Sequence, residues 1–377
     1  TLKDKQIKIN PLIQKLIRLN HKASGVYELR YQDVFEWVLS RLEYDEKDLK
    51  GIERAGCLVP HGIYIDSLLN SIDEEKLGEL FERIGFQQLS AGGNYEIVLK
   101  YCEKALAIKQ RYCGKDHTST GLILANLGRV WGEFGDYEKK KEFLTRALEI
   151  YEKNFGKNDV EVRAILNDLG NAWGELGDYE KKKDLLTRAL EISQNNYGKD
   201  DSATGVVLNN LANAWGDLGN YEKKKDLLTR SLEIKEKHFG KNHPSVSITL
   251  TNLGNAWGEL GNYEKQKDLL TRALEIKEKY SRKDHPEVAL TLNNLGNAWG
   301  ALGDNEKQKE LLVRALEIKE KHYGKDHIEV AITLNNLGDA WRELGDYEEQ
   351  KDPLARALMI KGESFRQRPP ECCCHTF

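Results

Sequence analysis

A block of 42 residues recurs along most of this sequence and constrains the fold more than any other feature. One copy, residues 166–190, reads LNDLGNAWGELGDYEKKKDLLTRAL, and the others differ from it at few positions. Six tryptophans lie 42 residues apart: Trp131, Trp173, Trp215, Trp257, Trp299 and Trp341. A weaker copy with Tyr95 and Ala105 in register precedes them, so we count about seven repeats over residues 79–362. Such a period indicates a small motif that buries its apolar face only by stacking on its neighbours.

Each repeat reads as two helices separated by turns. The first helix ends at a Gly followed by Asp or Asn, where Gly adopts a left-handed backbone cheaply and the next residue caps the second helix. These glycines are Gly135, Gly177, Gly219, Gly261, Gly303 and Gly345. The second helix places Leu186, Ala189 and Leu190 at helical spacing. The pattern therefore predicts an all-α chain.

The motif Leu-x2-Leu-Gly-x2-Trp-x3-Gly-Asp-Tyr, followed by Ala-Leu-Glu-Ile, resembles the tetratricopeptide signature. The 42-residue period with its Gly-Lys-Asp-His-Pro loop is similar to the variant in kinesin light chains and in the sensor arms of nucleotide-binding, winged-helix signal-transducing NTPases. The resemblance covers about three quarters of the chain. It implies a right-handed superhelical solenoid of about seven helix pairs, with peptide binding in the concave groove.

Two departures from that pattern affect packing. Long side chains replace the family's small Ala in the second helix: Lys140, Lys182, Lys224, Gln266, Gln308 and Gln350. We expect them to turn outward and to loosen the helix pair. Pro353 falls inside the last second helix. Because an interior Pro costs roughly 3 kcal/mol, we expect that helix to be kinked or frayed.

The first helices suggest a binding face. In the fourth repeat Leu250, Leu253, Gly254 and Trp257 share one sector, and Asn255 points away from it. Asparagines recur on this outward face, together with one Arg: Asn126, Arg129, Asn171, Asn210, Asn213, Asn252, Asn255, Asn294, Asn297 and Asn336. Amides offer a donor and an acceptor, so we predict that these residues clamp the main chain of an extended peptide. Two alternatives stay open, namely structural ladders between repeats and a record of recent duplication.

The charge of this face indicates the kind of partner. Acidic residues recur on it, at Glu133, Glu175, Asp217, Glu259, Asp339 and Glu343, and Arg129 is the one base assigned to it. Clamps for carboxylates need several Lys or Arg. The predicted partner is therefore a protein or extended peptide that is neutral or basic rather than acidic.

Other functional classes find little support. A net charge of −4 and a pI near 6.2 predict no affinity for nucleic acid or anionic membranes, and we interpret the Lys-Lys-Lys runs as solvated faces. The loop histidines His117, His243, His285 and His327 lie on separate repeats, which predicts turn or cap roles rather than a shared metal. No P-loop or nucleophile motif occurs. We therefore expect no catalysis, no metal and no cofactor.

We expect three regions: a helical N-terminal region over residues 1–78, the repeat array over 79–362, and a disordered tail over 363–377. Pieces of the first region resemble the linker that follows the winged helix in those NTPases. Cysteine spacing suggests neither disulfides nor zinc, which favours the cytoplasm. The leading hypothesis is the recognition arm of a larger signalling protein. The alternatives are a kinesin-light-chain-like cargo adaptor and a ligand-sensing fragment of an NTPase whose catalytic core is absent here, and the oligomeric state is open.

Overall fold

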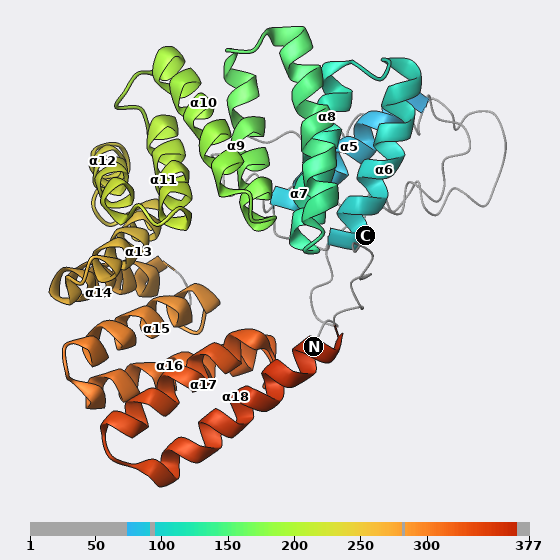
Figure 1. Cartoon of the computed structure of the whole chain (residues 1–377). Helices are drawn as coiled ribbons and strands as arrows, with labels where there is room; N and C mark the ends of the chain where they lie inside the picture. Colours follow the sequence, from blue (N-terminus) through green and yellow to red (C-terminus); the bar gives the residue numbers. More distant parts are fainter. Residues whose placement is uncertain (1–73, 91–94, 281–282, 368–377) are drawn as a thin grey trace, which may run out of the picture. The chain divides into compact units, whose positions relative to one another are not determined.

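The computed structural model describes residues 74–90, 95–280 and 283–367, and this part of the chain consists of helices joined by short loops (Figure 1). The helices are α5 (Glu74–Ser90), α6 (Tyr95–Tyr112), α7 (Thr118–Glu133), α8 (Tyr137–Phe155), α9 (Val160–Glu175), α10 (Tyr179–Tyr197), α11 (Ser202–Asp217), α12 (Tyr221–Phe239), α13 (Pro244–Glu259), α14 (Tyr263–Tyr280), α15 (Pro286–Ala301), α16 (Asn305–Tyr323), α17 (Ile328–Glu343) and α18 (Tyr347–Gln367). The predicted all-α fold with seven helix pairs is confirmed.

Two predictions fall wholly or mostly outside the described residues. The helical region predicted for residues 1–78 is described only from Glu74 onward, and most of the predicted tail, with Cys372, Cys373 and Cys374, follows the last described residue.

The helix boundaries are where the local sequence placed them. Gly135 has a φ of 77°, and the Asp136 side chain accepts the Lys139 backbone N–H at 3.0 Å. At the other end of the pair, the His243 ring accepts the Ser245 backbone N–H at 3.2 Å. His117, His285 and His327 cap their helices in the same way. The predicted cap roles of the loop histidines are therefore confirmed.

The chain divides into an N-terminal unit, Thr1–Leu176, and a C-terminal unit, Gly177–Phe377. The core of the N-terminal unit includes Phe81, Ile84 and Tyr101, each at most 2% exposed. In the C-terminal unit each repeat builds a small core with the next. One such core joins Ala212 of α11 and Leu228 of α12 to Leu253 and Ala256 of α13.

Long second-helix side chains are accommodated by glycines of the facing first helix, which corrects the prediction that they would turn outward and loosen the pair. A Cβ on Gly216 would lie 2.6 Å from Cδ of Lys224, and one on Gly258 would lie 2.5 Å from Oε1 of Gln266. Gln308, which faces Gly300, is 8% exposed. The family pattern makes room between the two helices with a small Ala on the second helix. Here a Gly on the first helix makes that room instead.

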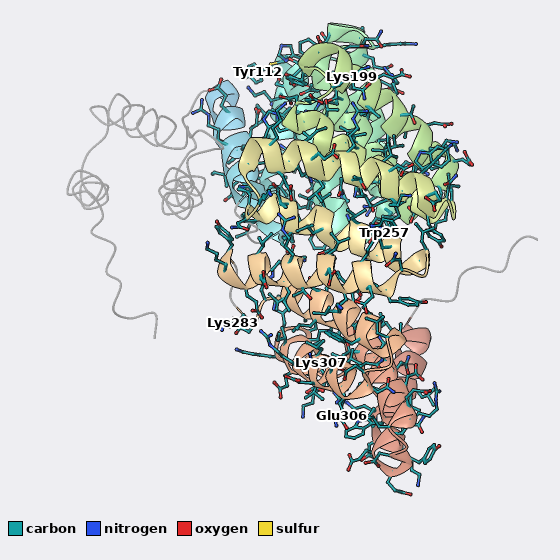
Figure 2. The ribbon with its side chains drawn as sticks, turned by 90° about the vertical axis from the view of Figure 1, so that its left-hand side faces the viewer. Tyr112, Lys199, Trp257, Lys283, Glu306 and Lys307 are labelled. Atoms are coloured by element: carbon teal, nitrogen blue, oxygen red, sulfur yellow. The ribbon has the colours of Figure 1, made fainter. Side chains whose placement is uncertain are left out.

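The lysine runs pack against the repeated tryptophans, which corrects the interpretation that they form a merely solvated face. Nζ of Lys265 lies 3.9 Å from the ring centroid of Trp257, and Nζ of Lys225, from the preceding repeat, lies 5.3 Å from it. Trp257, which is labelled in Figure 2, is half-buried. A cation over an indole ring is worth about 0.5–1 kcal/mol at such exposed sites, so the lysines join neighbouring repeats.

Helix α18 is continuous from Tyr347 to Gln367 and includes Pro353. The predicted fraying at this proline is therefore wrong. The carbonyl that loses its partner belongs to Glu349, which is exposed, so water can replace the missing hydrogen bond.

Candidate functional site

Four first helices of the C-terminal unit, α11, α13, α15 and α17, present the same strip of side chains. In α11 the strip is Val206, Asn210, Asn213 and Asp217, whose spacing of four, seven and eleven residues keeps them within one sector of the helix. The other three strips are Ile248, Asn252, Asn255 and Glu259; Leu290, Asn294, Asn297 and Ala301; and Ile332, Asn336, Asp339 and Glu343. We call these four strips together the asparagine face.

The first asparagine of three strips binds to the preceding first helix. Nδ2 of Asn252 donates to Oδ1 of Asn209 at 3.3 Å, and Nδ2 of Asn336 donates to Oδ1 of Asn293 at 3.2 Å. Asn294 has Thr251 in place of that acceptor and donates instead to Oδ1 of Asn255 at 3.2 Å. These hydrogen bonds form the ladder between repeats that was one alternative for this row.

The corresponding positions of the N-terminal unit differ. Asn126 of α7 is 1% exposed, and its Oδ1 accepts a hydrogen bond from Nη1 of Arg129 at 3.2 Å. Nε of Arg129 donates to Oδ2 of Asp168 at 2.7 Å. The placement of Asn126 on an open face is therefore wrong, because the angular argument considered one helix while burial depends on the surrounding helices. Asn171 of α9 is half-buried.

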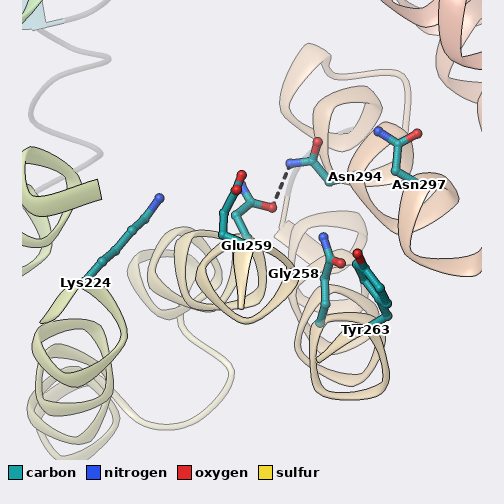
Figure 3. A pocket seen from close by; sticks show the side chains of 8 residues that line it. Lys224, Gly258, Glu259, Tyr263, Asn294 and Asn297 are labelled. Carbon is teal, nitrogen blue, oxygen red and sulfur yellow. Dashed lines mark hydrogen bonds between the residues drawn. The ribbon is translucent and has the colours of Figure 1, made fainter. Parts of the chain in front are cut away.

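In three of the strips the second polar residue is an asparagine whose side-chain amide has unused hydrogen-bonding capacity. In the described part of the chain, no side-chain hydrogen bond is found for Asn213 or Asn297, and Asn255 uses only its oxygen. Asn255 and Asn297 line a pocket of about 410 Å³ together with Lys224, Glu259 and Tyr263 (Figure 3). Gly258, Gln266 and Asn294 complete the lining. The pocket is therefore walled mainly by groups that both donate and accept hydrogen bonds.

Lysines of the second helices reach this face, although sequence reasoning assigned it a single base. Nζ of Lys182 lies 2.6 Å from Oδ2 of Asp217. Lys224, one repeat later, extends toward the side of the pocket where Glu259 lies (Figure 3). Burial lowers the pKa of Lys224, and the negative charges of Glu259 and Asp217 oppose that effect. The sequence signal was Gly216, which leaves space for the long side chain of Lys224.

The acidic residues at the end of the asparagine face are therefore largely compensated. Nη1 of Arg342 lies 2.9 Å from Oδ1 of Asp339, and Nε of Arg342 lies 3.3 Å from Oε1 of Glu343. The charge balance predicted from sequence, with one base against many acids, is wrong for the C-terminal unit. Three of the four acidic residues of the face, Asp217, Asp339 and Glu343, therefore lie in ion pairs.

The described part of the chain shows neither a metal-binding cluster nor a membrane-spanning helix. No cluster of three or more His, Cys, Asp or Glu with the geometry of a metal site is found among its residues. None of its helices is long and apolar enough to cross a membrane. The Cys102 thiol is 1% exposed, and burial raises its pKa to about 12, as expected for an inert core thiol.

Solved structures that are similar to this chain have low sequence identity to it. The apo form of the quorum sensor NprR from B. thuringiensis is 13% identical, with a TM-score of 0.69 over 93% of this chain and 92% of the other. The apo form of RapI is 14% identical, with a TM-score of 0.60 over 77% and 99%. The tetratricopeptide-like repeats of a kinesin light chain from Podosopora anserina are 21% identical, with a TM-score of 0.48 over 55% and 98%.

No curated protein matches the sequence. A family model, described as tetratricopeptide repeat, matches residues 87–153, 161–237, 207–279 and 287–360, which together exceed half of the chain. The matched segments lie within the part of the chain that forms helices α5 to α18. The chain belongs to the tetratricopeptide repeat family.

Proposed function

We propose that the asparagine face binds an extended peptide or an extended segment of another protein, and that the chain acts by recognition rather than by catalysis. The observation that carries the proposal is the row Asn213, Asn255 and Asn297, whose amides have unused hydrogen-bonding capacity beside a pocket. An amide pairs with the N–H and C=O of any residue, so such a row suits main-chain recognition.

The geometry of the repeats supports an extended ligand. First helices of consecutive repeats approach within 8 Å between Cα atoms, and packed helix axes lie about 8–10 Å apart. An extended chain advances about 3.3 Å per residue. One asparagine of the row therefore meets about every third residue of a peptide that crosses the helices.

The partner is neutral or basic rather than acidic in this proposal. The ion pairs Lys182–Asp217 and Arg342–Asp339 remove much of the negative surplus, so a neutral segment fits best. Glu259 and the open end of Lys224 allow one donor and one acceptor of the ligand to bind in the pocket.

We further propose that the array is the recognition arm of a larger cytoplasmic signalling protein. Support comes from NprR, a quorum sensor that shares the fold, and from the free thiols of Cys102 and Cys113, which suit a reducing compartment. A kinesin-light-chain-like cargo adaptor is the competing role. Both roles use the same face, so one binding experiment tests what they share.

The test is binding to an extended-peptide library by the wild type and by the triple variant Asn213→Ala, Asn255→Ala, Asn297→Ala. The control is Thr187→Ala, Thr229→Ala, Thr271→Ala, three exposed neutral residues of the second helices whose hydroxyls bond within their own helix. The proposal expects the asparagine variant alone to lose peptides while it stays folded, with no more stability lost than the Asn294–Asn255 hydrogen bond contributes. Retained binding, or a lower melting temperature with no peptide bound by the wild type, contradicts it.

A further inference from the structure

An aliphatic row runs along one edge of the asparagine face. Val206, Ile248, Leu290 and Ile332 are the first residues of the four strips, and between 42% and 46% of each is exposed. Each lies seven residues before the second asparagine or aspartate of its strip. At 1.5 Å per residue, the row runs about 10 Å from the row of Asn213, Asn255 and Asn297.

The residue at this position varies while its chemistry does not. The repeats carry Leu122, Ala164, Val206, Ile248, Leu290 and Ile332 there. Nearby positions such as the tryptophans are identical in all six copies, so duplication alone does not account for a position that changes yet stays aliphatic. A half-exposed helix position needs no apolar side chain for stability, and a polar one would serve solubility better.

The spacing of the row selects a ligand conformation. Its members recur once per repeat. Consecutive first helices approach within 8 Å between Cα atoms, and packed helix axes generally lie about 8–10 Å apart. In a polyproline II helix every third residue points the same way, at intervals of about 9.3 Å. In a β-strand every second residue does so, at about 6.6 Å. Only the polyproline II interval matches the spacing of the aliphatic row.

We infer that the C-terminal unit selects a peptide in the polyproline II conformation with an aliphatic side chain at every third position. The aliphatic row takes those side chains, and the asparagine row takes the main chain. This inference rests on the proposed function, because it assigns sequence preference to the same face. The lack of a strong charge on the face is consistent with a ligand recognised by apolar periodicity.

The experiment compares two labelled peptides of identical composition by fluorescence anisotropy. One has its four leucines three residues apart among serine, threonine and glutamine, and the other has its four leucines two residues apart, with the displaced serine, threonine and glutamine residues moved to its ends. The wild-type protein is expected to bind the first peptide at least tenfold more tightly. Each of Ile248→Ser, Leu290→Ser and Ile332→Ser is expected to weaken that peptide roughly tenfold.

Val313→Ser is the matched control, since Val313 is 38% exposed on the second helix α16. It should leave both affinities unchanged. Equal binding of the two peptides by the wild type overturns this inference and leaves the proposed function standing, provided that the Asn213, Asn255 and Asn297 triple variant still abolishes both. If neither peptide binds the wild type, this inference fails, and the peptide library decides the proposed function separately. The wild-type comparison needs no variant to fold, so it decides the inference by itself.

Discussion

Lys235 is a buried lysine that lacks the carboxylate found at the same place in the next two repeats. It is 4% exposed, and its Nζ donates to Oγ1 of Thr249 at 2.8 Å. The equivalent Lys277 lies 3.8 Å from Glu287, and Lys319 lies 2.9 Å from Glu329. Ser245 occupies the corresponding position for Lys235. We predict that Ser245→Glu stabilises the protein.

The magnitude follows from the pKa of Lys235, which burial lowers from 10.5 to about 8. Because one pKa unit corresponds to about 1.4 kcal/mol, the buried charge lowers the free energy of unfolding at pH 7 by about 3 kcal/mol. Between pH 8 and 10.5 the unfolded chain keeps this proton and the folded chain does not. The contribution of Lys235 to stability therefore rises with pH across that window, and its full cost is present below pH 8.

The new carboxylate should recover part of that cost. The side chains of Glu287 and Glu329 are 54% and 38% exposed, so water screens the pair and the expected gain at pH 7 is about 1–2 kcal/mol. Ser245→Gln is the control, since it matches the size without the charge. The backbone N–H of residue 245 can still bond to His243 in both variants, as Glu287 does to His285.

The assay is urea unfolding followed by circular dichroism at several pH values between 7 and 10.5, with the two variants compared at each pH. Titrations common to both variants cancel in this difference. The advantage of the Glu variant should shrink as Lys235 loses its proton. If the two variants are equally stable at pH 7, or if their difference does not change with pH, the account of Lys235 as an uncompensated buried charge is refuted.

Three further changes test the packing. Gly258→Ala alone should give no stabilisation, because its Cβ would lie 2.5 Å from Gln266. In a Gln266→Ala background, which removes that contact, Gly258→Ala should raise the melting temperature, because the helix propensity of Ala is more favourable than that of Gly by about 1 kcal/mol. Asn336→Ala should cost about 1–2 kcal/mol in denaturant unfolding, because it leaves Asn293, 5% exposed, without its donor; no loss there would argue against the ladder. Gly219→Ala should cost about 1 kcal/mol by the same measurement, because its φ is 76°.

The parts of the fold that depend on short stretches of chain were predictable from the sequence. Gly219 and the Asn220 that follows it specify a turn and a cap, and the structure shows the positive φ and the hydrogen bond to the Lys223 N–H. The helix pairing followed from the period, because a repeated amphipathic pair has to stack on its own copies.

The site was less predictable because it is built from residues of several helices. The angle of Asn126 on its own helix gave no information about the helices that bury it. Lys224 belongs to a second helix, and only the glycine of the facing helix allows it to lie beside the asparagine face. The length of a side chain and the size of the residues around it decide whether that side chain lies on the open face. A projection of one helix contains neither kind of information.

The two hydrogen-bonding registers of the ladder have a consequence for how a ligand could settle on it. Asn252 and Asn336 donate to an amide 43 residues earlier, whereas Asn294 donates to one 39 residues earlier. The second register is therefore accessible to this backbone, and Asn213 and Asn297 stand at its acceptor positions for Asn252 and Asn336. A donor with two acceptors nearby can exchange one for the other without being stranded. A ligand that takes one of these acceptors would therefore leave the donor asparagine the other.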